Sequence, residues 1–127
     1  VSLDSRRHQL IFEVNSVPSG VISFSLHDNV TVADWGFYLA PEAAKGSGRQ
    51  LGLVAMDYAF RKLCLHKLCG EVLAFNARSI NFHFSLGFKQ EGLLKENYFD
   101  GQSYHDVACF GLLAFEWNQN CLEGHEK

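Results

Sequence analysis

Polar and apolar residues alternate in two runs near the start of the chain, and a third run is largely apolar; both patterns are typical of β-strands. The runs span residues 8–14, 21–26 and 31–39. Residues 15–20, between the first two runs, are rich in Asn, Ser, Pro and Gly, which favours a turn. We therefore predict a hairpin from the first two runs and a third strand after it.

The apolar period changes to that of a helix after residue 48, and we predict a helix over residues 49–64. Its apolar stripe consists of Leu51, Val54, Ala55, Tyr58 and Ala59. Residues 68–75 read as a strand again, so strand, helix and strand form a βαβ unit with a parallel pair. Ligands of such units bind beyond the carboxyl ends of the strands. The ends at Leu39 and Phe75 are therefore expected to face one site.

The remaining residues predict one more helix and one more hairpin. The helix spans residues 77–86, with Ile80 and Phe84 packed inward and Gly87 as the C-cap. Strands over residues 88–98 and 104–117 are expected to pair around the turn Asp100-Gly101. The residues after Asn118 read as a polar, frayed tail.

Length and charge narrow the class of protein. The chain has 127 residues, which predicts one domain, residues 1–127. A net charge of −3 and a pI near 6.0 give no general attraction to nucleic acid or to an anionic membrane, so neither is an expected partner. No apolar run approaches the roughly 18 residues that span a bilayer, and no signal peptide is evident. The chain begins at Val1 without a methionine, which suggests a fragment.

Four cysteines are spaced unlike those of a secreted disulfide scaffold; they are Cys64, Cys69, Cys109 and Cys121. No second close pair of Cys or His completes the four ligands of a zinc site, so no metal is expected. We expect buried free thiols, as in a protein of the reducing cytoplasm.

Gly46-Ser47-Gly48 lies between the third strand and the helix. The start of a helix offers unpartnered N–H groups and a partial positive charge, and glycines let an anion approach them. The stretch from Pro41 to Gly52 is therefore a candidate phosphate-binding turn. It is one residue too long for the dinucleotide-binding glycine pattern, and Arg49 and Gln50 replace the Lys and Ser/Thr of a Walker loop. A plain turn with glycines for tight packing remains the alternative.

Two separated motifs resemble those of the GNAT acetyltransferases. Leu39-Ala40-Pro41 with Gly46-x-Gly48 resembles the family's coenzyme A pyrophosphate loop. The stretch from Asn76 to Phe88, which includes Ser79-Ile80 and Phe82-His83, resembles its next motif. The resemblance covers about residues 8–117. It implies a GNAT-like α/β (α+β) fold, in which helices flank a mixed, mostly antiparallel twisted sheet with one parallel strand pair, and acetyl-CoA as the co-substrate.

The sequence departs from the family pattern at two positions and at its start. Ala43 stands where the family usually has Arg or Gln, and Lys45 is expected to supply part of the missing charge. His83 stands where the family usually has Tyr. The family's first strand and two helices, which form one wall of its acceptor site, would lie before Val1.

The resemblance also implies roles for individual residues. Residues 45–49, which are Lys45, Gly46, Ser47, Gly48 and Arg49, are expected to meet the pyrophosphate. The backbone of Phe37, Tyr38 and Leu39 is expected to hold the thioester and the pantetheine arm, together with Asn76, whose alternative role is a helix N-cap. Phe82 is also expected near the coenzyme, with Trp35 and Phe99 as further aromatic surfaces; the alternative for each is a place in the core.

Two residues are expected to move protons. Transfer of an acetyl group to an amine requires a neutral amine and a proton for the leaving thiolate. His83, as imidazolium, is the expected acid, and its alternative is an exposed helix residue. The resemblance implies Glu71 as a candidate base, with a solvent-facing strand charge as its alternative. His105 and Asp106 are expected near the acceptor or simply on the surface.

A narrower resemblance points to the acceptor. Residues 33–41, 66–70 and 73–76, and Phe99-Asp100-Gly101 with Tyr104-His105, look like the acetyltransferases of pseudaminic acid biosynthesis. Those enzymes acetylate the C4 amino group of a UDP-linked amino sugar for flagellin glycosylation. The 90–92 stretch is shared with the ribosomal-protein N-terminal acetyltransferases, the second possibility. A degenerate coenzyme-A-binding module is the third. The expected partner is thus a small-molecule substrate, a UDP-amino sugar, with a homodimer left open.

Overall fold

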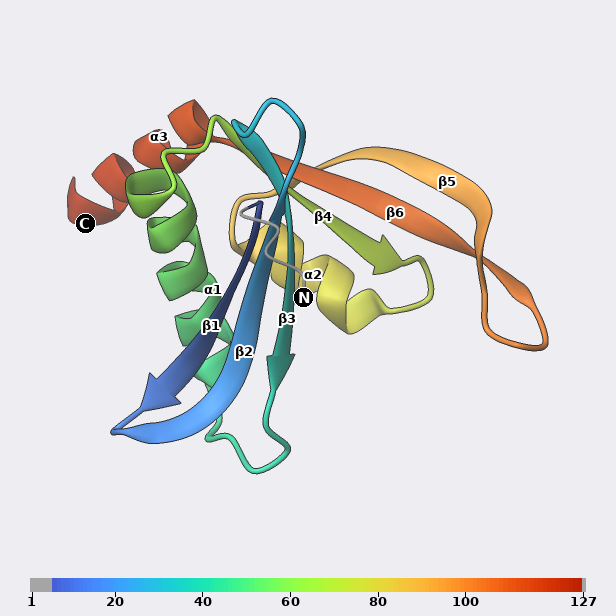
Figure 1. Cartoon of the computed structure of the whole chain (residues 1–127), viewed down its shortest axis with the longest axis horizontal. Helices are drawn as coiled ribbons and strands as arrows, with labels where there is room; N and C mark the ends of the chain where they lie inside the picture. Colours follow the sequence, from blue (N-terminus) through green and yellow to red (C-terminus); the bar gives the residue numbers. More distant parts are fainter. Residues whose placement is uncertain (1–5, 127) are drawn as a thin grey trace. The chain divides into compact units, whose positions relative to one another are not determined.

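The computed structural model describes residues 6–126, with side chains as far as Cys121. Its elements follow in the order β1 (Arg7–Val14), β2 (Val17–Leu26), β3 (Val32–Leu39), α1 (Ser47–Asp57), the π-helical turn η1 (Tyr58–Lys62), β4 (Lys67–Leu73), α2 (Ala77–Ser85), β5 (Lys89–Phe99), β6 (Tyr104–Leu113) and α3 (Ala114–Glu126) (Figure 1). The strand order is β1-β2-β3-β4-β6-β5, with β3 and β4 as the parallel pair. The predicted fold class, a mixed and mostly antiparallel sheet with helices, is confirmed.

The chain divides into two compact units, Val1–Leu68 and Cys69–Lys127, which we describe separately. The first unit contains the predicted hairpin, with Val14 opposite Val17. Its turn is shorter than predicted and consists of Asn15 and Ser16, both at positive φ (52° and 67°). That geometry is the one favoured by two-residue hairpin loops.

Gly20 explains why the predicted turn was too long. Glycine usually marks a loop, but here it lies within β2 and pairs with Leu39 of β3. A Cβ atom at this position would lie 2.5 Å from the carbonyl oxygen of Tyr38. The glycine is therefore required by the close approach of two strands.

The predicted helix is divided between α1 and the π-helical turn η1. Leu51, Ala55 and Ala59 of the predicted stripe are buried, as expected. Val54 was wrongly placed in this stripe, because it is 50% exposed and Phe60 is buried instead. The π-helical turn adds a residue to the helical repeat, so residues after Asp57 no longer follow the 3.6-residue spacing.

The second unit begins in β4 and contains α2, the β5–β6 hairpin and α3. The predicted C-cap of α2 is confirmed: Gly87 has a φ of 100° and donates to the carbonyl oxygen of Phe84, while Phe88 N–H donates to that of His83. This pair of bonds is the Schellman motif. The turn at Asp100-Gly101 is also confirmed.

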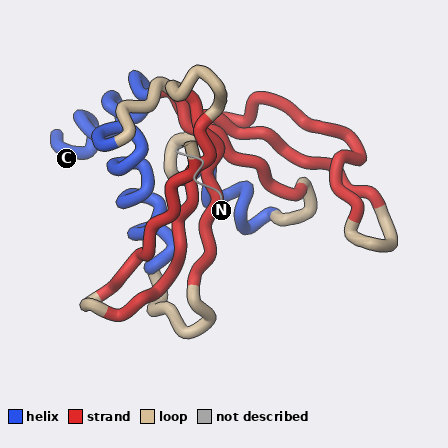
Figure 2. Tube along the Cα trace, in the orientation of Figure 1, coloured by secondary structure: helices blue, strands red, loops and turns tan. Residues whose placement is uncertain are grey.

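The prediction for the carboxyl-terminal residues was wrong. The strand ends at Leu113, and residues 114–126 form α3 (blue in Figure 2) where a longer strand and a frayed tail were expected. Glu116 accepts a hydrogen bond from the N–H of Leu113 at 3.0 Å, and Trp117 is buried. A carboxylate that caps the first turn favours a helix start at this point.

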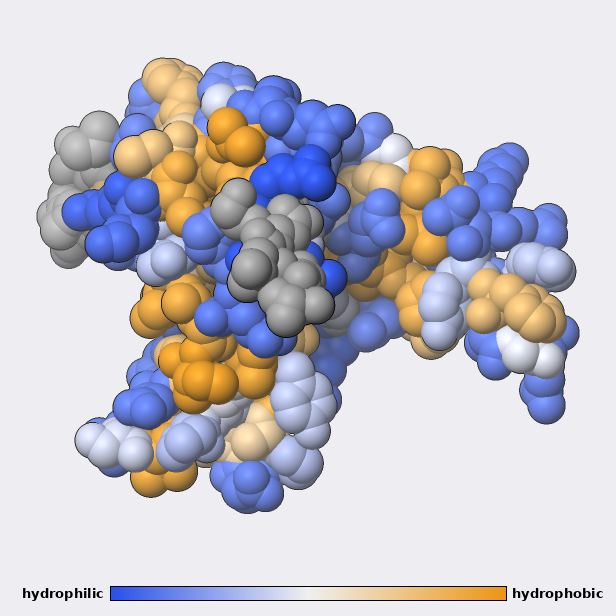
Figure 3. All heavy atoms as spheres, in the orientation of Figure 1, coloured by the Kyte–Doolittle hydropathy of each residue, from blue (hydrophilic) through white to orange (hydrophobic). Residues whose placement is uncertain are grey.

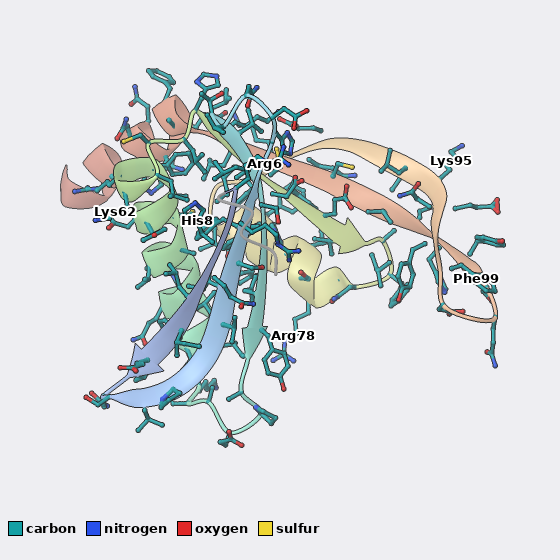
Figure 4. All side chains as sticks on the ribbon, in the orientation of Figure 1. Arg6, His8, Lys62, Arg78, Lys95 and Phe99 are labelled. Atoms are coloured by element: carbon teal, nitrogen blue, oxygen red, sulfur yellow. The ribbon has the colours of Figure 1, made fainter. Side chains whose placement is uncertain are left out.

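The β5–β6 hairpin is long, and every residue of β5 is exposed. Its register with β6 shifts twice, between Gln90 and Gly92 and between Leu94 and Tyr98. Figure 3 shows apolar residues at the surface of this hairpin, and Figure 4 labels Lys95 along it and Phe99 near its tip. Exposed apolar residues on an edge strand are a surface that proteins usually cover.

Candidate functional site

The glycine turn of the first unit has the backbone that the sequence predicted. Gly46 is the N-cap of α1 with a φ of 90°, and a Cβ atom there would meet no atom within 4 Å. No side chain caps this helix start, and its first turn contains no acidic residue. Lys45 and Arg49 are both exposed beside it. The turn is thus open and suited by charge to an anion.

Ser47 does not fit the expected role as well as its neighbours do. Its N–H donates to the carbonyl oxygen of Ala44 at 3.0 Å, and the residue is only 3% exposed. Its amide therefore closes the turn. Of the residues from 45 to 49, Lys45, Gly46, Gly48 and Arg49 remain the expected source of N–H groups.

A cavity of about 270 Å³ lies next to this turn in the same unit. It is lined by the β1–β2 turn and by the segment from Ala40 to Ala44. Ala43, where the family usually has Arg or Gln, is one of its lining residues. The small side chain at this position leaves space that a longer one would occupy.

The expected residues of β3 differ in exposure. Phe37 is half-buried, with its ring 5.1 Å from that of Trp35. Tyr38 is 62% exposed, and Leu39 is half-buried. The strand end is held by a hydrogen bond of 2.8 Å from Ala40 N–H to the carbonyl oxygen of Ser19.

Asn76 of the second unit is the N-cap of α2. Its side-chain oxygen accepts from the N–H of Ser79 at 3.1 Å, and the residue is exposed. The capping role that the sequence left open is confirmed. A contact with the coenzyme through the same side chain stays a prediction, as does that of the half-buried Phe82 in the middle of α2.

His83 occupies a place that the sequence did not predict. It is 3% exposed, and its ring stacks on Phe110 at 5.2 Å and lies edge-on to Phe88 at 5.1 Å. The alternative of an exposed helix residue is therefore wrong. Phe84, which was expected to point inward, is 48% exposed. His83 is thus the buried residue of α2, whereas Phe84 is partly exposed with its ring edge-on to that of Phe110 at 5.2 Å.

This burial changes the chemistry expected of His83. Burial among aromatic rings lowers its pKa from the usual 6.5, against a smaller rise from a hydrogen bond to Ser79. That bond joins Nδ1 to the carbonyl oxygen of Ser79 at 2.8 Å, and since a carbonyl only accepts, Nδ1 carries the proton. The neutral ring then has a lone pair on Nε2. These features disfavour the imidazolium acid expected from the motif.

Glu71 lies on β4 with its side chain exposed, while Leu68, Gly70 and Val72 are buried. This alternation puts Glu71 on the less buried face of the strand. An exposed carboxylate is compatible with both readings left open by the sequence, a base and a solvated charge.

Asp100 and His105 form a pair that the sequence did not predict. His105 Nε2 lies 2.7 Å from Asp100 Oδ2, and its ring lies edge-on to Phe75 at 4.9 Å. Alternation along β6 puts His105 and Phe110 on opposite faces, so His105 faces away from His83. The signal in the sequence was an Asp-Gly turn followed by a histidine on the returning strand.

Among the described residues, no group of three or more His, Cys, Asp or Glu side chains is placed to hold a metal ion. None of the four cysteines forms a disulfide, but the prediction that they are buried was wrong: Cys64 is exposed and the others are half-buried. Within residues 6–126, no helix is long and apolar enough to cross a membrane.

Known proteins resemble the chain in sequence. The sequence profile described as "Acetyltransferase (GNAT) domain" matches residues 3–89. The chain belongs to the GNAT acetyltransferase family. An SPbeta prophage-derived N-acetyltransferase of Bacillus subtilis is 35% identical over 68% of the chain and 50% of its own length. The spermidine N(1)-acetyltransferase of Vibrio cholerae is 37% identical over 67% of the chain and 50% of its own length. The chain thus spans about half the length of these GNAT relatives.

Solved structures agree with this family. A mutant of the Vibrio cholerae spermidine N-acetyltransferase superposes with a TM-score of 0.87 at 26% identity, over 94% of this chain and 72% of that one. A dodecameric structure of the enzyme from the same organism gives a TM-score of 0.82 at 26% identity, over 90% of this chain and 68% of that one. The GNAT resemblance drawn from the two motifs is therefore confirmed.

Proposed function

We propose that this chain catalyses acetyl transfer from acetyl-CoA to a primary amine. The observation that carries the proposal is the open, uncapped amino terminus of α1 at Gly46, with Lys45 and Arg49 beside it and no acidic residue in the first turn. Such a terminus favours a phosphate group. We assign the pyrophosphate to this turn, and the thioester and pantetheine arm to the backbone of Phe37–Leu39. A contact of the coenzyme with Asn76 stays a prediction.

The charges of the two units favour a cationic acceptor. Residues 1–68 contain seven Lys and Arg against six Asp and Glu, whereas residues 69–127 contain four against eight. The negative net charge of the second unit therefore attracts cations, whereas the slightly positive first unit is more favourable for a coenzyme phosphate. We propose a polyamine such as spermidine as the first acceptor, which agrees with the names of the Vibrio cholerae and Escherichia coli relatives.

The UDP-linked amino sugar is the second proposed acceptor. Its support is the narrower sequence resemblance around Phe99-Asp100-Gly101. A nucleotide diphosphate is anionic, and the β5–β6 hairpin offers it Lys89 and Lys95 against Glu91, Glu96, Asp100 and Asp106. Because the acidic residues outnumber the lysines, the sugar nucleotide is a weaker candidate acceptor than the polyamine.

The test is release of free coenzyme A thiol with three acceptors: spermidine, a UDP-linked amino sugar and a ribosomal-protein amino-terminal peptide. We expect acetylation of spermidine, with the product confirmed by mass spectrometry. Acetylation of the sugar nucleotide alone would overturn the proposed acceptor. Coenzyme A binding without transfer to any amine would favour the degenerate binding module.

The coenzyme turn can be tested separately by Gly48→Asp, which places a carboxylate beside the proposed pyrophosphate site. Charge repulsion should reduce coenzyme A affinity by about 10²-fold or more in titration calorimetry. The matched control is Gly92→Asp on β5, where a Cβ atom would meet nothing within 4 Å. Equal affinities for the two variants would remove the turn from the site.

We also propose self-association as the assembled form of the protein. Its support is β5, an edge strand whose residues are all exposed and include Leu93 and Leu94. Light scattering on the purified chain should give the mass of a homodimer or larger assembly. A monomer mass at high concentration would contradict it. The cytoplasm as the place of action stays a prediction.

A further inference from the structure

Asp100 is held in place by the β5–β6 turn. Its Oδ1 accepts the N–H groups of Gln102 at 2.7 Å and Ser103 at 2.8 Å, and its Oδ2 lies 2.7 Å from His105 Nε2. The hydrogen bond from Ser103, followed by those from His105 and Gln102, lowers the pKa of Asp100 to about 2. The carboxylate is therefore ionised near neutral pH and only accepts hydrogen bonds.

This carboxylate fixes the tautomer of His105. Because Asp100 Oδ2 accepts, Nε2 of His105 carries the proton, and Nδ1 of the neutral ring holds the lone pair. His105 is half-buried, and its side chain keeps 27% of its surface exposed. A base oriented by a buried or fixed carboxylate is a recurrent arrangement in proton transfer.

The ring also lies at the end of a strand. Phe75 follows the carboxyl end of β4, and its ring contacts that of His105 at 4.9 Å. Ala74 N–H donates to the carbonyl oxygen of Asp106 at 2.9 Å, and this bond holds β6 beside the residues that follow β4. The carboxyl ends of strands in a βαβ unit are where ligands bind. Phe75 is 65% exposed and offers an aromatic surface to a cation at the same place.

We infer that His105, positioned by Asp100, is the base that takes a proton from the acceptor ammonium. This inference rests on the proposed acetyl transfer. In the step, Nδ1 of His105 accepts one proton from R–NH₃⁺, and the free amine attacks the thioester carbonyl. A carbon–nitrogen bond forms, the carbon–sulfur bond breaks, and the thiolate leaves with the electron pair. The excess proton of the amine is lost to solvent.

The first test compares two small amines of similar shape. Ethylamine is largely protonated at neutral pH and needs a base, whereas trifluoroethylamine is largely neutral and does not. His105→Gln should lower kcat/KM for ethylamine by about 10²-fold and change that for trifluoroethylamine by less than about threefold. An equal loss for both amines would overturn the base role and leave a structural one.

Asp100→Asn tests the positioning role. The amide oxygen still accepts from the turn, which tolerates Asn. The amide N–H₂ then donates to Nε2, so the proton of the neutral ring moves to Nδ1 and the lone pair is lost there. We expect the same selective loss for ethylamine. An unchanged ratio between the two amines would remove Asp100 from the proposal.

The matched control is His27→Gln, because His27 Nε2 lies 3.0 Å from Asp34 Oδ2 in an equivalent pair of the first unit. It should leave both rates unchanged.

The pH profile of kcat/KM with spermidine gives a second readout, since His105→Gln should flatten its acidic limb. The titratable groups near the His105 ring are Asp100 and the cross-strand partner of His105, Tyr98. The sequence neighbours of His105, Tyr104 and Asp106, are titratable as well. A parental profile in His105→Gln contradicts the inference, whereas an inactive parent contradicts the proposed function.

Discussion

His83 and His105 lie on opposite faces of β6, and their surroundings give the same side chain different chemistry. His83 packs against Phe88 and Phe110, and its Nδ1–H is bound by a carbonyl oxygen. His105 is half-buried, and its Nε2–H is bound by the carboxylate of Asp100. The motif drew attention to His83, but exposure and hydrogen-bond partner favour His105 for proton transfer. Position in a motif is thus a weaker guide to chemistry than the atoms around the ring.

The largest expected difference between them is in stability. His83→Ala removes a ring from between aromatic side chains and should lower the free energy of unfolding by about 2–4 kcal/mol. His105→Ala removes a partly exposed hydrogen bond to Asp100 and should cost about 1 kcal/mol. Urea denaturation of both variants measures the difference. Equal losses would contradict the burial of His83.

The two histidines should also differ in their effect on stability at acidic pH. The pKa of His83 is lowered on folding, so between that pKa and 6.5 the unfolded chain binds more protons than the folded one. Stability should therefore fall as the pH decreases through this window. His83→Phe should remove that contribution, as shown by urea denaturation at several pH values. A parental pH dependence in the variant would show that His83 is not the source.

His83→Phe also separates the motif-based expectation from the structural one. An essential acid would slow single-turnover transfer by about 10²- to 10⁴-fold when removed. The buried neutral ring predicts a rate within about threefold of the parent, since a phenylalanine fills the same apolar place. A slowdown in the larger range, with coenzyme affinity retained, would restore His83 as the acid.

The smallest expected effect is that of Glu71→Gln. Glu71 is an exposed carboxylate on β4, so its loss should raise KM for spermidine a few-fold through weaker attraction and leave kcat nearly unchanged. Steady-state kinetics at low salt measures both constants. A large fall in kcat with a flattened acidic limb would instead identify Glu71 as the base.

The sequence predicted the fold well where the pattern is local. The first and third strands, the glycine turn at Gly46 and the C-cap at Gly87 are each decided by a few neighbouring residues, and all are confirmed. The start of α3 was missed because residues 104–117 read as one apolar run, and only the cap by Glu116 marks where the strand ends. Periodicity does not show such a cap.

The candidate site was predicted less completely. The glycine turn was predicted, and the N-cap at Asn76 was given as the alternative role of that residue, because both depend on backbone geometry that short sequences encode. The burial of His83 was missed, since His83 is polar and its neighbour Phe84 is apolar, yet the tertiary packing buries the histidine. The bond between Asp100 and His105 depends on the hairpin bringing them together, which spacing alone does not give.

Ring-nitrogen NMR of both histidines tests most directly whether surroundings decide which one can accept a proton. Spectra of His83→Phe and His105→Gln assign the signals. We expect His83 to be the Nδ1–H tautomer and to have its titration midpoint below 6.5, the pKa of an unperturbed histidine. We expect neutral His105 to be the Nε2–H tautomer. A His83 that titrates at or above pH 6.5, or a His105 with its proton on Nδ1, would contradict the account.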